Sequence, residues 1–327
     1  MQKKKRNLII ILSVLFGVFA LVVGFELFWH YGKTYPEFSA HAKQEFLLPD
    51  LKEGFTPQGI ASKDDKFLIC GYMKSGPSRI YVIDGEDYEY FTLTVDGAAY
   101  AGHCGGITTY DNFGYVVGDK QIVVFDIDAA IALDDKMSLD AIAILDCPNG
   151  ADFVNAQNDV LLIGEFYHKD KYPTKQSHHI NSADGVNPAL TYAYNLDNGL
   201  PVGFDIDAPI YAISTTEKIQ GACFDDAGRI ILSQSWALAD SHLFVYKPLS
   251  EIVNTSMTID DQVIDVYVLD SSNLLKDIVA PCMSEEVTLY DGRIFIMFEN
   301  ASSKYRIVTR TRYKNCYSIN IDDFIAV

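Results

Sequence analysis

Five stretches of the chain repeat one pattern: a small or polar turn, a short strand, an Asp, Asn or Gly break, and a second strand. They start at Gly59, Gly106, Asp152, Gly221 and Glu286, which are spaced by 47, 46, 69 and 65 residues. A two-strand unit that recurs over most of a chain is typical of a β-propeller, because each blade buries its faces only against neighbouring blades. The two long spacings predict extra loop in two blades.

The repeats predict the strands of each blade. The repeated pair is interpreted as the inner strands a and b. Thirteen residues after each start, where strand b ends, come Tyr72, Asp119, Glu165, Gln234 and Glu299. Alternating segments rich in Val, Ile, Tyr and Phe predict strand c at 78–84, 121–127, 191–197, 242–247 and 315–321. The same reasoning predicts the outer strand d at 88–95, 139–146, 208–214 and 262–270.

The fifth blade lacks an outer strand in its own repeat. Its most economical source is segment 43–48, since a strand from the N-terminal side closes the ring and removes an exposed edge. Hydrophobic residues make up 49% of the chain and aromatic residues 13%, which is ample for one large core. We therefore predict an all-β, five-bladed propeller over residues 43–327, with six blades as the alternative.

The N-terminus has a different character. Lys3, Lys4, Lys5 and Arg6 precede an apolar run at 7–25, which Trp29 and Tyr31 follow. Such a run is long enough to span a bilayer as a helix, and the positive flank places its N-terminal end in the cytoplasm. We predict a basic stub and membrane anchor at 1–33, a linker at 34–42, and an extracytoplasmic propeller. The alternative is a cleaved signal peptide, with Ala40-His41-Ala42 resembling a cleavage site.

Net charge narrows the choice of partners. Residues 1–33 carry five cationic side chains against Glu26, so the remainder of a chain with net charge −18 carries −22. An acidic surface repels phosphate backbones, which excludes nucleic acid as an expected partner. Cations, neutral sugars, basic peptides and cell-wall polymers stay open. The alternative is that the acidity only keeps the domain soluble.

Six cysteines are present, and none forms a C-x-x-C pair. This pattern argues against a structural zinc site or a thioredoxin-type motif. Buried free thiols are one interpretation. An exported location also permits disulfides, for which Cys282 with Cys316 is the first pair to test.

Propeller function usually lies at the mouth of the central channel. Residues just before strand a and at the end of strand b should meet on one face. The candidate ligand-binding residues there are Gln58, Tyr72, Asp119, Gln220, Gln234 and Glu285. The insertion at 166–188 should overhang this mouth and adds His168 and Tyr172, with His178 and His179 beside them. A solvated loop and solvated strand ends are the alternatives.

Several carboxylates at one mouth raise one another's proton affinity or recruit a cation. No cofactor is required by the sequence, but Ca²⁺ would suit the oxygens of Asp119, Asp152, Glu165, Glu285 and Glu299 better than zinc would. Alternatively, Glu165, Glu299 and Asp152 act as catalytic acid and base, assisted by His103 ahead of two glycines. Carboxylates satisfied by backbone N–H groups are the third interpretation.

Segments IYVID, IVVFD and LFVYK, at 80–84, 122–126 and 243–247, each close a blade. They resemble the repeats of bacterial YVTN-type and lactonase-like propellers. The resemblance covers residues 43–327 and implies a propeller fold in an extracytoplasmic or enzymatic setting, without assigning a catalytic residue. We expect an anchored propeller that binds a sugar, peptide or envelope ligand at its mouth. The alternatives are a glycosidase-like or lactonase-like hydrolase and a scaffold for partner proteins.

Overall fold

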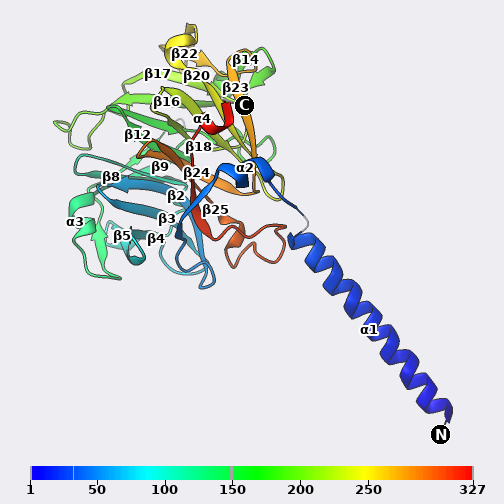
Figure 1. The fold of residues 1–327 in the computed structure, drawn as a ribbon. Coiled ribbons are helices and arrows are strands. Elements are labelled where there is room, and N and C mark those ends of the chain that lie inside the picture. The colour runs from blue at the N-terminus through cyan, green and yellow to red at the C-terminus, as the bar shows by residue number, and fades with distance from the viewer. Residues whose placement is uncertain (1, 32, 148–149, 326–327) are drawn as a thin grey trace.

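The protein is a five-bladed β-propeller with one long helix at its N-terminus. The computed structural model describes residues 2–31, 33–147 and 150–325. Helix α1 (Gln2–Tyr31) projects away from the ring of blades (Figure 1). Its segment Lys5–Trp29 is long and apolar enough to cross a membrane, a property that an anchor and a signal sequence share.

Each blade is an antiparallel sheet of four strands, a to d. Blade 1 contains β2 (Phe55–Lys63), β3 (Lys66–Met73), β4 (Arg79–Asp84) and β5 (Asp87–Val95). Blade 2 contains β7 (Gly106–Tyr110), β8 (Phe113–Gly118), β9 (Gln121–Asp126) and β11 (Ala143–Asp146). Blade 3 contains β12 (Phe153–Gln157), β13 (Val160–Gly164), β16 (Ala189–Asn195) and β17 (Pro209–Thr215). Blade 4 contains β18 (Ile219–Phe224), β19 (Arg229–Gln234), β20 (Ser241–Pro248) and β23 (Leu274–Ala280).

Blade 5 contains β24 (Ser284–Tyr290), β25 (Arg293–Phe298), β26 (Asn315–Ile319) and β1 (Lys43–Leu47). Additional strands are β6 (Ala98–Ala99), β10 (Ser138–Asp140), β14 (Ile180–Ser182), β15 (Gly185–Asn187), β21 (Asn254–Ile259) and β22 (Gln262–Val268). Short helices are α2 (Pro36–His41), α3 (Ile127–Ile131), α4 (Asp322–Ile325), η1 (Gln176–His178), η2 (Leu249–Glu251) and η3 (Glu299–Ala301). The inner strands β2, β7, β12, β18 and β24 contact one another in a closed ring.

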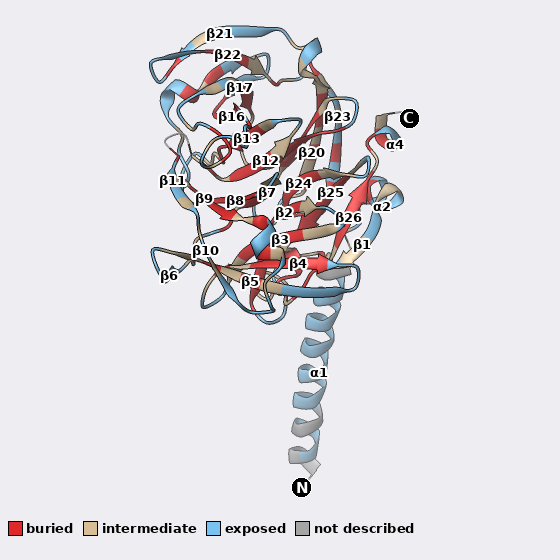
Figure 2. Ribbon diagram, turned by 90° about the vertical axis from the view of Figure 1, so that its left-hand side faces the viewer, coloured by how far each residue is buried: buried red, intermediate tan, exposed pale blue. Residues whose placement is uncertain are grey.

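The a–b hairpins form where the sequence breaks predicted them. Four of the turns place Asp or Asn in the left-handed region, at Asp64, Asp111, Asn158 and Asp291. These side chains tolerate positive φ better than other residues with a Cβ, and the turn matches the twist of the strands. The inner strands between the turns are buried (Figure 2); in β8, for example, all six residues are buried.

The ring closes through the N-terminal strand, which confirms the prediction for segment 43–48. Strand β1 pairs antiparallel with β26, with Lys43 opposite Ser318 and Gln44 opposite Tyr317. The fifth blade is therefore built from both ends of the propeller sequence. This pairing leaves no open edge at the junction.

Two outer strands were predicted wrongly. Segment 262–270 was expected as strand d of blade 4, but β22 runs parallel to β17 on the outer edge of blade 3, and β23 pairs with β20 instead. Segment 139–146 was expected as one strand, but it divides. Its first part, β10, pairs parallel with β5 of blade 1, and β11 pairs with β9. Several alternating segments follow strand c in these blades, and periodicity alone does not choose between their edges.

The constant thirteen-residue register also fails in two blades. Phe153 lies opposite Gly164 as Gly106 lies opposite Val117, so the blade 3 unit starts one residue later than the sequence pattern suggested. In blade 4 a longer turn places Gly221 opposite Ser233. In both blades the residue thirteen positions after the predicted start therefore lies one position earlier along strand b than its counterpart in blade 2.

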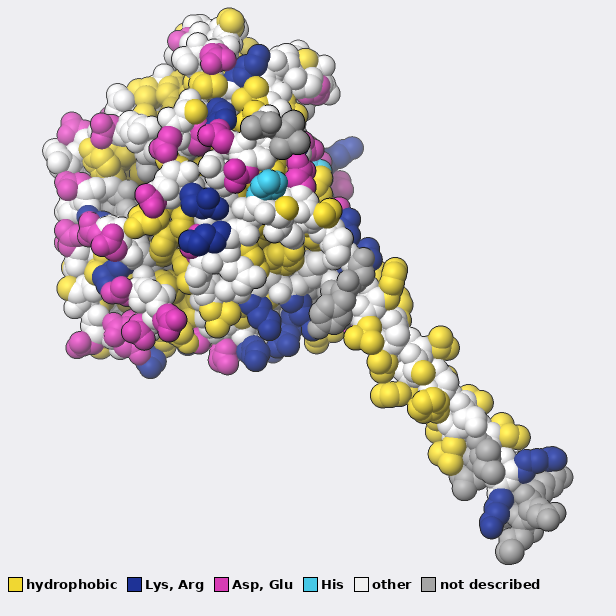
Figure 3. All heavy atoms as spheres, in the orientation of Figure 1, with side chains coloured by type: hydrophobic (Ala, Val, Ile, Leu, Met, Phe, Trp, Pro, Cys, Tyr) yellow, Lys and Arg dark blue, Asp and Glu magenta, His cyan; other side chains and the backbone are white. Residues whose placement is uncertain are grey.

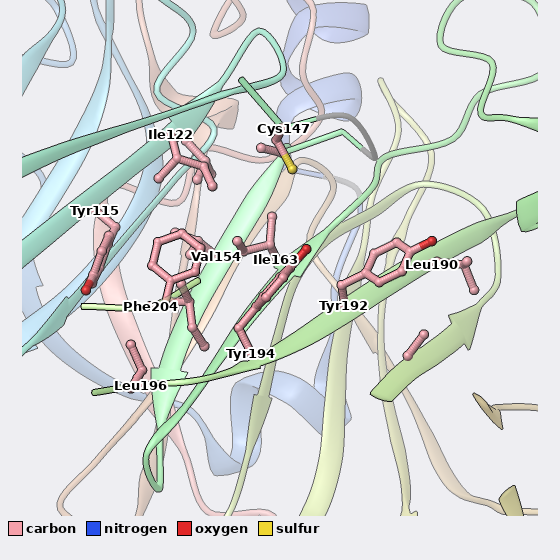
Figure 4. Close-up of a cluster of buried hydrophobic side chains, with 14 of the residues drawn as sticks. Tyr115, Ile122, Cys147, Val154, Ile163, Leu190, Tyr192, Tyr194, Leu196 and Phe204 are labelled. Carbon is pink, nitrogen blue, oxygen red and sulfur yellow. The ribbon is translucent and has the colours of Figure 1, made fainter. Parts of the chain in front are cut away.

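The core consists of apolar clusters between neighbouring blades. Figure 4 shows the one between blades 2 and 3, where Tyr115, Tyr194 and Phe204 pack edge to face. Another cluster joins blades 4 and 5 and includes Tyr35 and Phe38 from the segment that follows α1. Burial of such side chains stabilises the fold by roughly 1.5–3 kcal/mol each.

All six cysteines are buried and none forms a disulfide. The thiol of Cys282 lies near the Thr311 hydroxyl, and Cys316 donates to the Ile296 carbonyl. The candidate Cys282–Cys316 disulfide is therefore not formed. The thiols act as small apolar core groups.

Candidate functional site

A buried glutamate lies where the inner strands meet at the propeller axis. Glu286 on β24 is completely buried. Its Oε2 accepts hydrogen bonds from the N–H groups of Ile60 and Ile107, both at 2.9 Å, and its Oε1 accepts one from Val154 at 3.1 Å. These donors occupy equivalent positions on β2, β7 and β12. One carboxylate thus connects blade 5 to blades 1, 2 and 3.

Glycine makes this convergence possible. A Cβ on Gly106 would lie 2.4 Å from Oε1 of Glu286, and one on Gly221 would lie 2.7 Å from the Glu286 Cα. No side chain fits at such distances. Burial raises the pKa of Glu286, and its three backbone donors oppose the shift.

A pair of carboxylates, Glu285 and Glu299, lies beside the axis on the face that carries the b–c loops, here called the mouth face. Gln58 donates to Oε2 of Glu299 at 3.0 Å. Glu285, which is 2% exposed, precedes the axial glutamate and interacts electrostatically with Glu299. Lys304, from the loop after β25, donates to the Tyr72 hydroxyl at 2.6 Å. This group combines two acids, an amide and a lysine.

The two acids hold their protons tightly. Burial raises the pKa of Glu299 to about 8, while Lys304 and Gln58 oppose the shift. Burial and the nearby Glu299 also raise the pKa of Glu285 well above its ordinary range. Two interacting carboxyls, one buried and one half-buried, cannot both ionise readily. At neutral pH the pair therefore retains at least one proton.

This pair predicts a pH-dependent stability. Because the folded pKa of Glu299 lies above its ordinary value of 4.5, its contribution is fully present below that value and is lost as pH rises toward 8. Between pH 4.5 and 8, we expect the free energy of unfolding of Glu299→Gln to decrease by about 2 kcal/mol less than that of the unaltered protein. Urea titrations at both ends of the range measure the change. Glu251→Gln, at an exposed site, is the control, and equal slopes in both variants would contradict the prediction.

Blade 2 adds an aromatic surface to the mouth face. The His103 ring stacks on Tyr72 with centroids 5.0 Å apart, and its backbone N–H donates to Asp119 at 3.0 Å. The ammonium of Lys304 lies 4.6 Å from the Tyr72 ring centroid and 4.7 Å from that of Tyr305. Asp119 thus helps to hold His103 in place. Tyr72 interacts electrostatically with Glu299, and Lys304 does so with both glutamates.

The blade 3 carboxylates hold the long insertion. Asp152 accepts from the Phe166 N–H at 2.8 Å, and burial raises the pKa of Asp152 to about 6. Both Glu165 oxygens lie 2.9 Å from Nδ1 of His178, and Nε2 of His178 lies 3.1 Å from Asp260. Burial alone would lower the pKa of His178, but these two carboxylates raise it. The His178 imidazole thus connects the insertion to Glu165 of blade 3 and to Asp260 in the turn of the β21–β22 hairpin.

The insertion carries an aromatic cluster that continues onto blade 4. Trp236 lies in the loop after β19, and its ring centroid is 4.4 Å from that of His168. Phe166 and Tyr172 lie 5.7 and 6.1 Å from the same ring. Tyr172 is 52% exposed. These four rings, here called the tryptophan cluster, form the second aromatic surface of the mouth face.

The remaining predicted site residues are placed as follows. Gln234 donates to the Glu217 carbonyl at 2.9 Å, and Gln220 is partly buried on β18. Among the described residues, no group of three or more His, Cys, Asp or Glu side chains is arranged to hold a metal ion. In the part of the chain that the structure describes, one cavity of about 210 Å³ lies beside α3. Another, of about 310 Å³, lies between α2 and the loop after η3, where Arg312 and Tyr313 line it.

Sequence reasoning missed five residues of this region. Glu286 stands at a repeat position that is glycine in three other blades, and this substitution was a usable signal. Trp236, Lys304 and Tyr305 lie in b–c loops, which the predicted topology already assigned to the mouth face. Nothing in the local sequence paired Asp260 with His178, since the two are 82 residues apart.

The chain resembles solved propellers in fold only. Glutaminyl cyclase from Myxococcus xanthus shares 9% identity over 85% of this chain and 95% of its own, with a TM-score of 0.43. PQQ-bound aldose sugar dehydrogenase from Streptomyces coelicolor shares 12% over 85% and 95%, with a TM-score of 0.45. BamB from Moraxella catarrhalis shares 10% over 80% and 82%, with a TM-score of 0.32. No protein-family model and no curated protein sequence matches the chain. The solved propellers support the predicted resemblance at the level of the propeller fold only.

Proposed function

We propose that this protein is an anchored extracytoplasmic propeller that binds a neutral or amino sugar of the cell envelope across its mouth face. The tryptophan cluster is the observation that carries the proposal. Sugars present apolar C–H faces that pack on aromatic rings and hydroxyl groups that donate to carboxylates. The mouth face supplies both kinds of partner, and α1 supplies the anchor.

Charge supports this choice of ligand class. Outside residues 1–33 the chain carries −22, so anionic polymers are repelled. Both aromatic surfaces already attract cations: Lys171 lies 5.1 Å from the Trp236 centroid, and Lys304 lies over Tyr72. A neutral or cationic sugar fits this environment.

Trp236→Ala should weaken sugar binding at least tenfold, since the loss of a stacking ring corresponds to about 1.4 kcal/mol or more. The full chain in nanodiscs would be titrated against immobilised neutral and amino glycans, with a peptide panel in parallel. Tyr88→Ala removes a ring that is 49% exposed on β5 of blade 1 and serves as the matched control. Saturable peptide binding without sugar binding would overturn the proposal, as would sugar binding that Trp236→Ala leaves unchanged.

Hydrolysis is the second candidate, because the pKa of about 8 places a protonated Glu299 beside a second carboxyl at neutral pH. Such a pair can serve as acid and base on a glycosidic or ester bond. Turnover of a substrate panel that Glu299→Gln abolishes would support this activity. Turnover that survives the substitution would exclude Glu299 as its acid.

A further inference from the structure

We propose that the loop at 303–314 is a second membrane contact, which binds anionic lipid headgroups beside α1 and holds the mouth face next to the bilayer. The proposal rests on the proposed function in one respect, namely that α1 spans the membrane. We call this segment the basic loop. It connects β25 and η3 to β26 on the mouth face.

The composition of the basic loop differs from that of the rest of the domain. It contains five of the 26 Lys and Arg residues of the chain, and no acidic residue occurs between Glu299 and Asp322. The cations are Lys304, Arg306, Arg310, Arg312 and Lys314. Figure 3 shows Lys and Arg side chains gathered on the domain beside the base of α1. A domain that is otherwise acidic thus presents positive charge where the anchor leaves it.

The tip of the basic loop is apolar and exposed. Ile307 is 74% exposed and Val308 is 50% exposed. Exposed apolar side chains flanked by cations are typical of segments that lie in the interfacial layer of a membrane. The cations suit anionic headgroups, and the apolar pair suits the layer just beneath them.

Contacts with α1 place the tip at the depth of that layer. The indole N–H of Trp29, at the C-terminal end of the apolar run, donates to the Val308 carbonyl at 2.8 Å. The Arg310 guanidinium lies 5.0 Å from the Trp29 ring centroid and 5.8 Å from that of Phe28. Tryptophan at the end of a spanning helix lies at the headgroup level. Ile307 and Val308, beside it, lie at the same level.

This contact would orient the mouth. Lys304 belongs to the basic loop and also lies over Tyr72 at the mouth. On blade 4, Asp240 lies in the loop after β19 and pairs with Lys33 at 2.9 Å, so a second mouth-face loop contacts the segment after α1. The mouth face therefore lies on the side from which α1 leaves, and ligands would reach it from the layer adjacent to the bilayer.

The proposal is tested in the full chain with a fluorophore on one introduced cysteine, since the six native thiols are buried. Ile307→Cys carries the label at the loop tip. Val263→Cys, 77% exposed on β22, is the matched control, and Leu21→Cys, 75% exposed on α1, reports the anchor. Nitroxide-bearing lipid and aqueous iodide quench the label in nanodiscs of phosphatidylcholine with and without phosphatidylglycerol.

We expect lipid quenching at position 307 to exceed that at 263 several-fold and to rise with phosphatidylglycerol. The double variant Arg306→Glu and Lys314→Glu should reduce it to the level at 263. Lys136→Glu with Lys247→Glu, which changes the net charge equally elsewhere, should leave it unchanged. Equal iodide quenching at 307 and 263, with position 21 quenched by lipid, would overturn only the membrane contact. Absence of lipid quenching at position 21 would overturn the anchor and the membrane contact together.

Discussion

Replacement of Glu286 by alanine is expected to lower the free energy of unfolding by about 4 kcal/mol. The substitution leaves the N–H groups of Ile60, Ile107 and Val154 buried without their acceptor. Each unsatisfied buried donor costs about 1–3 kcal/mol. Because the three donors belong to different blades, the loss would loosen the ring at its centre. Urea denaturation followed by circular dichroism measures the effect.

Two further variants separate hydrogen bonding from volume. Glu286→Gln keeps the shape but directs an amide N–H₂ at a backbone donor, so we expect a loss of about 2 kcal/mol. Glu285→Gln, at the adjacent buried position, removes repulsion from Glu299 and should cost little. If both glutamine variants were equally stable, the axial hydrogen bonds would not be important for stability.

His178→Ala is expected to destabilise the protein by about 3 kcal/mol, because it removes the imidazole from the buried Glu165 and leaves that carboxylate the Leu190 N–H as a donor. Glu165 is 5% exposed and His178 is completely buried. The insertion at 166–188 should detach from blade 3 and become sensitive to protease. Because the folded pKa of His178 is raised, its contribution is fully present below pH 6.5 and is lost as pH rises through the folded pKa. In the His178→Ala variant, the free energy of unfolding should therefore fall less steeply as pH rises than it does in the unaltered protein.

His242→Ala provides the comparison for a surface pair. Nδ1 of His242 lies 2.8 Å from Asp277, with the two side chains 32% and 40% exposed. Its removal should cost less than about 1 kcal/mol. Similar losses in both histidine variants, with the insertion equally resistant to protease, would show that the buried His178–Glu165 pair has no special role.

The inner strands of each blade were predictable because they pair with strands that are adjacent in the sequence. Each a–b hairpin joins two apolar strands through a short turn whose residues, such as Asp64 and Asp291, are visible in the sequence. The outer strands of blades 2 and 4 were not predictable in the same way. After strand c of blade 4, the segments β21, β22 and β23 all alternate between apolar and polar residues. Only tertiary packing assigns β21 and β22 to the outer edge of blade 3.

The sequence predicted which face of the propeller carries the candidate site, but it did not predict most of the side-chain contacts there. Topology placed Gln58 and Glu299 together, and their hydrogen bond follows from it. It could not show that Glu165 is bound to a histidine from the insertion, because that contact depends on the fold of the loop. Nor could it show that Lys304 reaches Tyr72 from another blade.

The pairing of β1 with β26 has a consequence for how the protein matures. Of the propeller strands, the ribosome makes β1 first and β26 last, so β1 stays unpaired while some 270 residues are added. Intermediates before that moment expose a free edge and are vulnerable to aggregation. Chains that lack β26 should therefore aggregate more readily than chains with the closed ring.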